Sequence, residues 1–183
     1  FLIELVRDRV DPNILKTAVL NGAYESAFRG LRNTTANADK YQCNVPWIII
    51  FDPTSACNKH CIGCWSADYE KWQNLTYEEC DKIVTQGSEL GCHLYMMTGG
   101  EPLVRKKDVL RLAEEHNDCL FNIFTNASLI DQPFCDEVKR LGNIVFSISL
   151  EGYEDTNDAR RGDGSYDEVM RAMDLLHKNG LLF

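Results

Sequence analysis

The sequence lacks the features that would place it in a membrane or outside the cell. Its longest apolar run is Trp47 to Phe51, whereas a helix needs about 20 apolar residues to cross a bilayer. The start of the chain also lacks the basic, apolar and small-residue segments of a secretory signal. We therefore expect a soluble protein of the cytoplasm that has no membrane partner.

Long basic runs are missing as well. The chain has 19 Lys and Arg residues against 28 Asp and Glu residues, which gives a net charge of −9. Proteins that bind nucleic acid neutralise its phosphates with clustered basic side chains, so we expect no nucleic-acid partner. Hydrophobic residues make up 44% of the chain and charged residues 26%. This composition is typical of a globular protein and excludes a disordered one.

Cysteine is more frequent than in most chains of this length. Three of the eight cysteines crowd together as Cys57, Cys61 and Cys64. Because nothing indicates secretion, reduced metal ligands explain this group better than disulfides do. An isolated cysteine more often behaves as a small buried apolar residue. We expect this of the remaining five, which are Cys43, Cys80, Cys92, Cys119 and Cys135.

Apolar periodicity divides the chain into two parts. Residues from about Glu4 to Arg32 have helical spacing, and the polar segment Asn33–Asp39 predicts a linker. Beyond it, capping-box patterns beginning at Thr76 and Ser165 predict helix starts. The predicted strands are 47–51, 93–97, 120–124 and 144–148, with a fifth beginning at 181, and the predicted helices are 76–90, 107–117, 132–141 and 165–179.

Strands and helices therefore alternate, and each crossover is long enough to bring the chain back parallel. This pattern predicts an α/β fold with a parallel sheet and right-handed crossovers. The apolar first strand is expected to be buried on both faces. Ligands of such sheets bind beyond the C-terminal ends of the strands, so functional residues are expected just after each strand. Because the chain starts with Phe1 and ends as a strand begins, we expect a fragment with an open, aggregation-prone edge.

The crowded cysteines follow the first predicted strand with the spacing C-x3-C-x2-C. Thiolates are soft anionic ligands, and a short loop can place three of them around one iron–sulfur cube. Three protein ligands leave the fourth iron open for a substrate or cofactor, whereas a structural zinc site is closed by a fourth ligand. A zinc site completed by His60 or Cys43 stays open as an alternative, as does an electron carrier with a distant fourth cysteine.

A glycine-rich turn, Thr98–Pro102, follows the second predicted strand. Gly99 and Gly100 allow the backbone to approach a ligand closely, and Glu101 adds a negative charge that could meet an ammonium group. Glycine and proline are also common in ordinary turns between a strand and a helix. The position of the motif, one strand away from the cysteines, favours a ligand-binding turn over an ordinary one.

Polar residues also follow the third and fourth predicted strands. Asn126, Ser149 and Glu151 could form hydrogen bonds to a ribose or to a small polar substrate. Asn126 and Ser149 could equally be helix caps or turn residues. Arg160 and Arg161 offer guanidinium groups suited to a carboxylate, although either could be a solvated surface charge.

These motifs, in this order, resemble the radical S-adenosylmethionine (radical SAM) superfamily from about residue 43 to the end. The resemblance implies a partial parallel (βα) barrel. Residues 1–42 would be a helical N-terminal segment and linker, and residues 43–183 a truncated core of about four βα units and the start of a fifth strand. It also implies the site: Cys57, Cys61 and Cys64 as ligands of a [4Fe-4S] cluster, and Gly99, Gly100, Glu101, Asn126, Ser149, Glu151 and Arg161 as contacts of S-adenosylmethionine.

Two positions depart from the family pattern. The residue before the last cluster cysteine is often aromatic and covers the adenine, but here it is Gly63, and Trp65 is a candidate to replace it. Glu151 stands where an aspartate is common, which puts the expected ribose contact in doubt.

By the same resemblance, one electron from a donor such as flavodoxin or ferredoxin would cleave S-adenosylmethionine into methionine and a 5′-deoxyadenosyl radical. The radical would abstract hydrogen from a substrate. Our first expectation for that substrate is a peptide or protein, as in maturases with a C-terminal extension for auxiliary clusters. The alternatives are a small molecule in cofactor biosynthesis and a non-enzymatic metal-binding module. We expect the fragment alone to be inactive.

Overall fold

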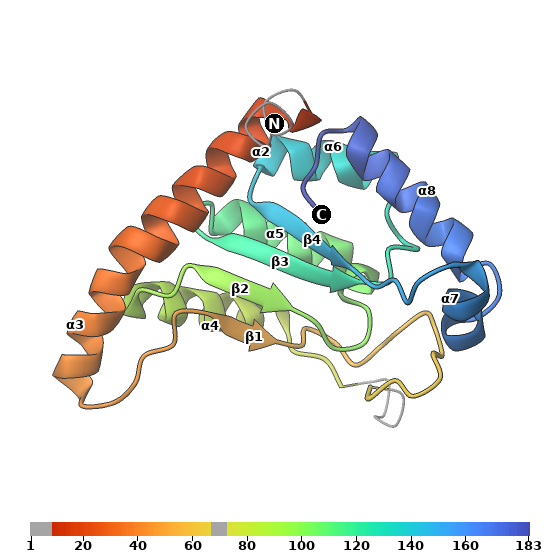
Figure 1. Ribbon diagram of the computed structural model, residues 1–183. Coiled ribbons are helices and arrows are strands. Elements are labelled where there is room, and N and C mark those ends of the chain that lie inside the picture. Colours follow the sequence, from red (N-terminus) through yellow and green to blue (C-terminus); the bar gives the residue numbers. More distant parts are fainter. Residues whose placement is uncertain (1–8, 67–72) are drawn as a thin grey trace.

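The computed structural model describes residues 9–66 and 73–183. Within them, four strands form one sheet in the order β1-β2-β3-β4 (Figure 1). The strands are β1 (Ile49–Phe51), β2 (Leu94–Met97), β3 (Leu120–Thr125) and β4 (Ile144–Ile148). Each strand pairs parallel with the next. The predicted α/β fold with a parallel, partial barrel is confirmed.

Helices connect the strands, and α4 and α5 lie against one face of the sheet (Figure 1). The longer ones are α4 (Tyr77–Leu90), α5 (Lys106–Glu115), α6 (Gln132–Leu141) and α8 (Ser165–Lys178). Val109 and Leu112 of α5 and Phe134 and Val138 of α6 are buried in one shared core, because they recur on a single helical face. In the part of the chain that the structure describes, no helix is long and apolar enough to span a membrane.

The isolated cysteines mostly belong to this core. Cys80, Cys92, Cys119 and Cys135 are buried, as expected, whereas Cys43 is exposed. Burial raises the pKa of the Cys135 thiol to about 11, which keeps this thiol protonated at neutral pH. The prediction is wrong for Cys43 because this residue follows the last helix of the N-terminal segment and lies outside the core.

From Pro12 to Tyr41 the N-terminal segment is a continuous run of helix made of α2 (Pro12–Thr17), the π-helix η1 (Ala18–Gly30) and α3 (Leu31–Tyr41). The beginning of the predicted helix, residues 4–8, lies outside the described residues. It crosses the end of the sheet at which the strands begin (Figure 1). The predicted linker at 33–39 is wrong, since these residues lie within α3. Their polarity has another cause: Asn37 Nδ2 donates to Leu90 O at 3.1 Å, and the Thr34 hydroxyl donates within its own helix. The division of the chain at residue 42 stays a prediction.

The two edges of the sheet differ from expectation. Ile50 is 61% exposed, so the predicted burial of the first strand on both faces is wrong for this residue; among the described residues, β1 pairs only with β2. At the other edge, residues 181–183 are not assigned as a strand. The N–H of Phe146 nevertheless donates to Leu182 O at 3.2 Å, so the end of the chain lies beside β4.

The two expected capping boxes have different outcomes. Thr76 and Glu79 form both reciprocal bonds of the box at the start of α4, as predicted. At the start of α8 the N-cap is Gly164, and Asp158 accepts from the N–H groups of Gly164 and Tyr166 at 2.7 and 2.8 Å. The capping role of Ser165 was therefore predicted wrongly. Asp158 lies on α7 (Glu154–Arg161), a short helix that the sequence pattern did not predict.

Two helical glycines, Gly87 and Gly22, give a matched test of how closely the helices pack against the sheet. A Cβ at Gly87 in α4 would lie 2.3 Å from the Tyr95 hydroxyl oxygen and 2.8 Å from Ile49 Cδ1, whereas at Gly22 in η1 its nearest contact would be 3.7 Å away. We expect Gly87→Ala to lower the free energy of unfolding by about 1–3 kcal/mol, because it overpacks the core. Gly22→Ala should be neutral or stabilising, since alanine favours helix by up to about 1 kcal/mol. Urea denaturation measures both; equal effects would contradict the packing described.

Candidate functional site

The predicted functional residues gather where the strands end, around a pocket of about 280 Å³. The pocket is lined by nine of them: Cys57, Cys61, Cys64, Gly99, Gly100, Glu101, Asn126, Ser149 and Arg161. Glu151 is not among the lining residues. Arg160, Gly63 and Trp65 line the pocket as well. Side chains from four successive strand ends thus meet at one place.

The three cysteines have the spacing of cluster ligands. All three are half-buried, and sulfur atoms on one zinc ion would be about 3.8 Å apart, given a Zn–S distance of about 2.3 Å. Among the described residues, the only group of three ligand atoms within 4.8 Å of one another lies elsewhere, at His93, Asp118 and Cys119. The three thiols do not form such a group, and the C-x3-C-x2-C loop that carries them suits the ligation of an iron–sulfur cube.

The electrostatic surroundings of Cys57 also favour a bound metal cluster. Burial raises the pKa of the Cys57 thiol, and the charges of Glu101, Cys61 and Cys64 raise it further. Thiolates in such surroundings need a cationic partner, and metal binding supplies one while releasing the thiol protons. The donor set and its surroundings fit a cluster.

The glycine-rich turn holds the start of the cysteine loop. The N–H of Gly100 donates to Thr54 O at 2.9 Å, and the N–H of Glu101 donates to Ala56 O at 2.8 Å. A Cβ at Gly100 would lie 2.1 Å from Ala56 O, so only glycine permits this approach. Gly99 adopts a φ of 107°, in the region that glycine reaches without strain. The two glycines are therefore required by backbone packing, whatever they bind.

Glu101 joins the second strand end to the third. Its side chain is 1% exposed and accepts three hydrogen bonds, from the Thr125 hydroxyl at 2.7 Å, the Asn126 N–H at 2.7 Å and the Leu103 N–H at 3.0 Å. Burial raises the pKa of this carboxyl group, and the three donors oppose the rise. An ionised carboxylate has about four acceptor positions, so one remains for a ligand.

Sequence reasoning missed the residues that fix the far side of the cysteine loop. Lys59 Nζ pairs with Glu168 Oε2 at 2.5 Å, and the N–H of Ile62 donates to Arg160 O at 2.8 Å. Asn58 lies between two partners: its amide donates to the Ser128 hydroxyl at 2.8 Å and its carbonyl accepts from Asn126 Nδ2 at 2.9 Å. Asn58 and Lys59 lie between the first two cysteines, at positions where the spacing motif specifies no residue type, so the sequence gives no signal of their partners.

Glu151 bonds to the two arginines. Its Oε2 pairs with Arg160 Nη1 at 2.8 Å and its Oε1 with Arg161 Nη2 at 2.5 Å. The hydrogen bond from Arg161 is the main influence that lowers the pKa of Glu151. The side chain of Arg161 is 16% exposed, so its guanidinium is held firmly at the pocket wall. The ribose contact predicted for Glu151 stays a prediction.

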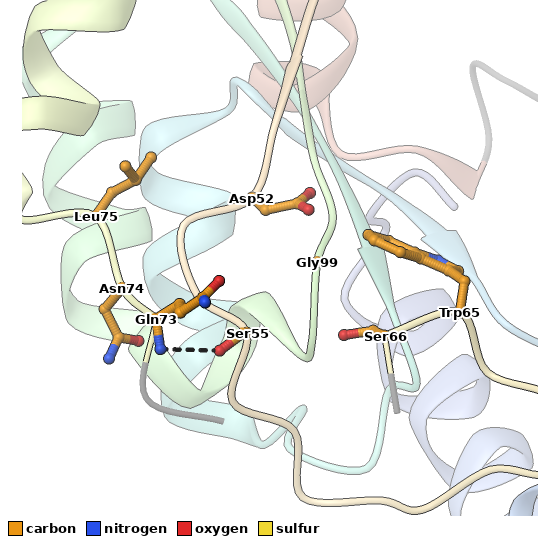
Figure 2. Close-up of a pocket in the computed structure, with 8 residues that line it drawn as sticks. All are labelled: Asp52, Ser55, Trp65, Ser66, Gln73, Asn74, Leu75 and Gly99. Carbon is orange, nitrogen blue, oxygen red and sulfur yellow. Dashed lines mark hydrogen bonds between the residues drawn. The ribbon is translucent and has the colours of Figure 1, made fainter. Parts of the chain in front are cut away.

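Trp65 borders a second pocket beside the first. This pocket has a volume of about 530 Å³ and is lined by Asp52, Ser55, Trp65, Ser66, Gln73, Asn74, Leu75 and Gly99 (Figure 2). Trp65 and Gly99 line both pockets. Trp65 therefore lies where it can contact a ligand in either one.

Comparison with known proteins gives one family: the Radical SAM superfamily model matches residues 51–182. An uncharacterized protein of Archaeoglobus fulgidus is 36% identical over 127 residues, covering 68% of this chain and 30% of the relative. Fe-coproporphyrin III synthase of Methanosarcina barkeri is 29% identical over 139 residues, covering 73% of this chain and 35% of the relative. The chain thus spans about a third of the length of these relatives.

Solved structures show the same fold. SuiB of Streptococcus suis, bound to S-adenosylmethionine, matches with a TM-score of 0.68 and 22% identity, covering 84% of this chain and 36% of that protein. SuiB has also been solved bound to its precursor peptide SuiA, with the same TM-score.

The three hydrogen bonds that Glu101 accepts, here called the Glu101 clamp, can be tested by mutation. Glu101→Gln replaces one acceptor oxygen by an NH₂ group that would face a donor, and a buried donor left without an acceptor costs about 1–3 kcal/mol. We expect the free energy of unfolding to fall by that amount. The matched control is Glu154→Gln, an exposed position on α7, where the change should stay within about 0.5 kcal/mol. If both variants unfold like the wild type in urea, the clamp contributes no stability.

Proposed function

The chain belongs to the radical SAM superfamily, and from this we propose that it forms the part of an enzyme that binds a [4Fe-4S] cluster and S-adenosylmethionine. Cys57, Cys61 and Cys64 would hold the cluster. When bound, the two cofactors together supply a 5′-deoxyadenosyl radical able to abstract hydrogen from a substrate. The observation that carries this proposal is the meeting of three thiols from one loop with charged and polar groups in one pocket.

Opposite charges of that pocket suit the two ends of an amino acid. Glu101, with one acceptor position left, would receive the ammonium group of S-adenosylmethionine, as would the backbone at Gly99 and Gly100. Arg161 would bind the carboxylate, because a guanidinium forms paired hydrogen bonds with it. Glu151, which bonds Arg161 in the structure, would keep this guanidinium in position.

Other contacts follow the same strand ends. Asn126 and Ser149 both line the pocket and would form hydrogen bonds with the ribose. Glu151 would contribute through the acceptor position that its three hydrogen bonds from the arginines leave open. We propose that residues 43–183 constitute the cofactor-binding core and residues 1–42 a helical segment that precedes it.

For the substrate we propose a peptide or protein, in line with the fold shared with SuiB, which has been solved with a precursor peptide. The second candidate is a small molecule of cofactor biosynthesis, which the name of the Fe-coproporphyrin III synthase relative favours. An electron donor such as flavodoxin or ferredoxin and a cytoplasmic location complete the proposal.

Anaerobic reconstitution tests the proposed cofactors. We expect about four irons and four sulfides per chain, the content of one cube, and a change in the EPR spectrum of the reduced cluster when S-adenosylmethionine is added. Iron analysis and EPR measure both. One bound zinc, or a cluster whose spectrum ignores S-adenosylmethionine, would reject the proposal.

The ligand assignment has its own matched pair. Cys61→Ala removes a thiol from the pocket and should abolish iron binding after reconstitution. Cys135→Ala removes a thiol from the core, where Cys135 is fully buried, and should keep the full iron content while lowering stability. Iron and sulfide analysis compares the two variants. Full iron content in Cys61→Ala would show that the ligands are assigned wrongly.

A further inference from the structure

The second pocket has the size and position of a substrate site. Its volume of about 530 Å³ falls within the range of about 300–1,000 Å³ that is common for small-molecule sites. It lies directly beside the pocket lined by the three cysteines, here called the cofactor pocket, because Trp65 and Gly99 border both. A group bound here would sit next to the place where the proposed radical forms.

Asp52 gives this pocket its charge. The residue directly follows β1, and its carboxylate is directed toward the side of the pocket formed by Trp65 (Figure 2). Room for it depends on Gly99, since a Cβ there would lie 2.9 Å from Asp52 Cβ and 3.1 Å from its Cγ. The turn that shapes the cofactor pocket thus also leaves space for this carboxylate.

The Asp52 residue is exposed to solvent at the pocket, and its carboxylate forms no hydrogen bond or ion pair within residues 9–66 and 73–183. The partial burial of the carboxylate raises its pKa. Other acidic groups near these pockets have partners: Glu101 accepts three hydrogen bonds, and Glu151 pairs with two arginines. A partly desolvated carboxylate without a donor favours a positively charged ligand and repels an anionic one.

Trp65 adds a second feature that favours a cation. Its side chain is 58% exposed and forms one wall of the pocket (Figure 2). The face of an indole ring attracts ammonium and guanidinium groups. Elsewhere the pocket is lined by further polar side chains, including Ser66 and Gln73, which can bind the polar remainder of a substrate.

We propose that this pocket binds a cationic nitrogen group of the substrate, with Asp52 as its counter-ion and Trp65 as its aromatic wall. The inference rests on the proposed function, since it names the substrate chemistry of that same site. Within the first-choice substrate class, the group is a lysine or arginine side chain of a peptide; within the second, it is the amine of a small molecule. In both, the carbon atoms next to the cation would lie beside the cofactor pocket.

Ligand-observed NMR with two pairs of probes tests the proposal on the reconstituted protein. N-acetyl-lysine methylamide and its neutral analogue N-acetyl-norleucine methylamide represent a peptide, while butylammonium and butanol represent a free amine. We expect the cationic member of a pair to bind about fivefold more tightly, the effect of a partly exposed ion pair. The pair that shows the larger preference identifies the source of the cation.

Variants then assign that preference to the residues. Asp52→Asn keeps the shape but removes the charge, and should abolish the preference for the cationic probe. Trp65→Leu should reduce it about twofold or more, given the usual size of an exposed cation–π contact. Asp136→Asn makes the same charge change at an exposed position on α6 and should keep the preference. Circular dichroism checks that each variant is folded.

The possible failures are distinguishable. Wild-type protein that takes up a cluster and responds to S-adenosylmethionine, but binds charged and neutral probes equally, would overturn this inference and leave the proposed function intact. Loss of the cluster response in the wild type would contradict the proposed function, whatever the probes show. A preference that Asp52→Asn retains would overturn the role of Asp52.

Discussion

The contact between Gly100 and the carbonyl of Ala56 is the constraint on which the rest of the site depends. With two backbone hydrogen bonds from the same turn, it fixes where the cysteine loop leaves β1. Glu101, the next residue, then fixes the end of β3 through Thr125 and Asn126. One turn of the chain thereby sets the relative positions of three strand ends. Buried hydrogen bonds of this kind are costly to break, so the loop has one defined place before any cofactor binds.

Charge pairs connect this frame to the helices beyond β4. Lys59 of the cysteine loop bonds to Glu168 of α8, and Glu151 bonds to both arginines at the end of α7. The positive groups at the cofactor pocket are therefore neutralised by acidic partners in the protein. Asp52 in the neighbouring pocket is different, since it has a charge without a partner among the described residues. The arginines beside the cofactor pocket are thus paired within the protein, whereas the carboxylate of Asp52 is open to the cation that we propose.

Much of the fold could be predicted because its signals are local. Short apolar runs identified the strands, and the box at Thr76 identified the start of α4. Predictions were wrong where a distant residue supplied the partner. The polar stretch at 33–39 was predicted to be a linker, but it is helical, and Asn37 donates to the last carbonyl of α4. Ser165 was predicted to cap α8, but Asp158, seven residues earlier, accepts from the N–H groups at the start of this helix.

The sequence by itself determined the chemistry of the site: three thiols in one short loop, a glycine pair before a glutamate, and polar residues after successive strands. These are properties of residue type and spacing, and the parallel sheet brings them to one edge. Only the tertiary structure decided how these groups are used. It paired Glu151 with the arginines, gave Glu101 its three donors, and left Asp52 facing a pocket beside Trp65. Such pairings depend on distances between residues far apart in the chain, which spacing along the sequence does not contain.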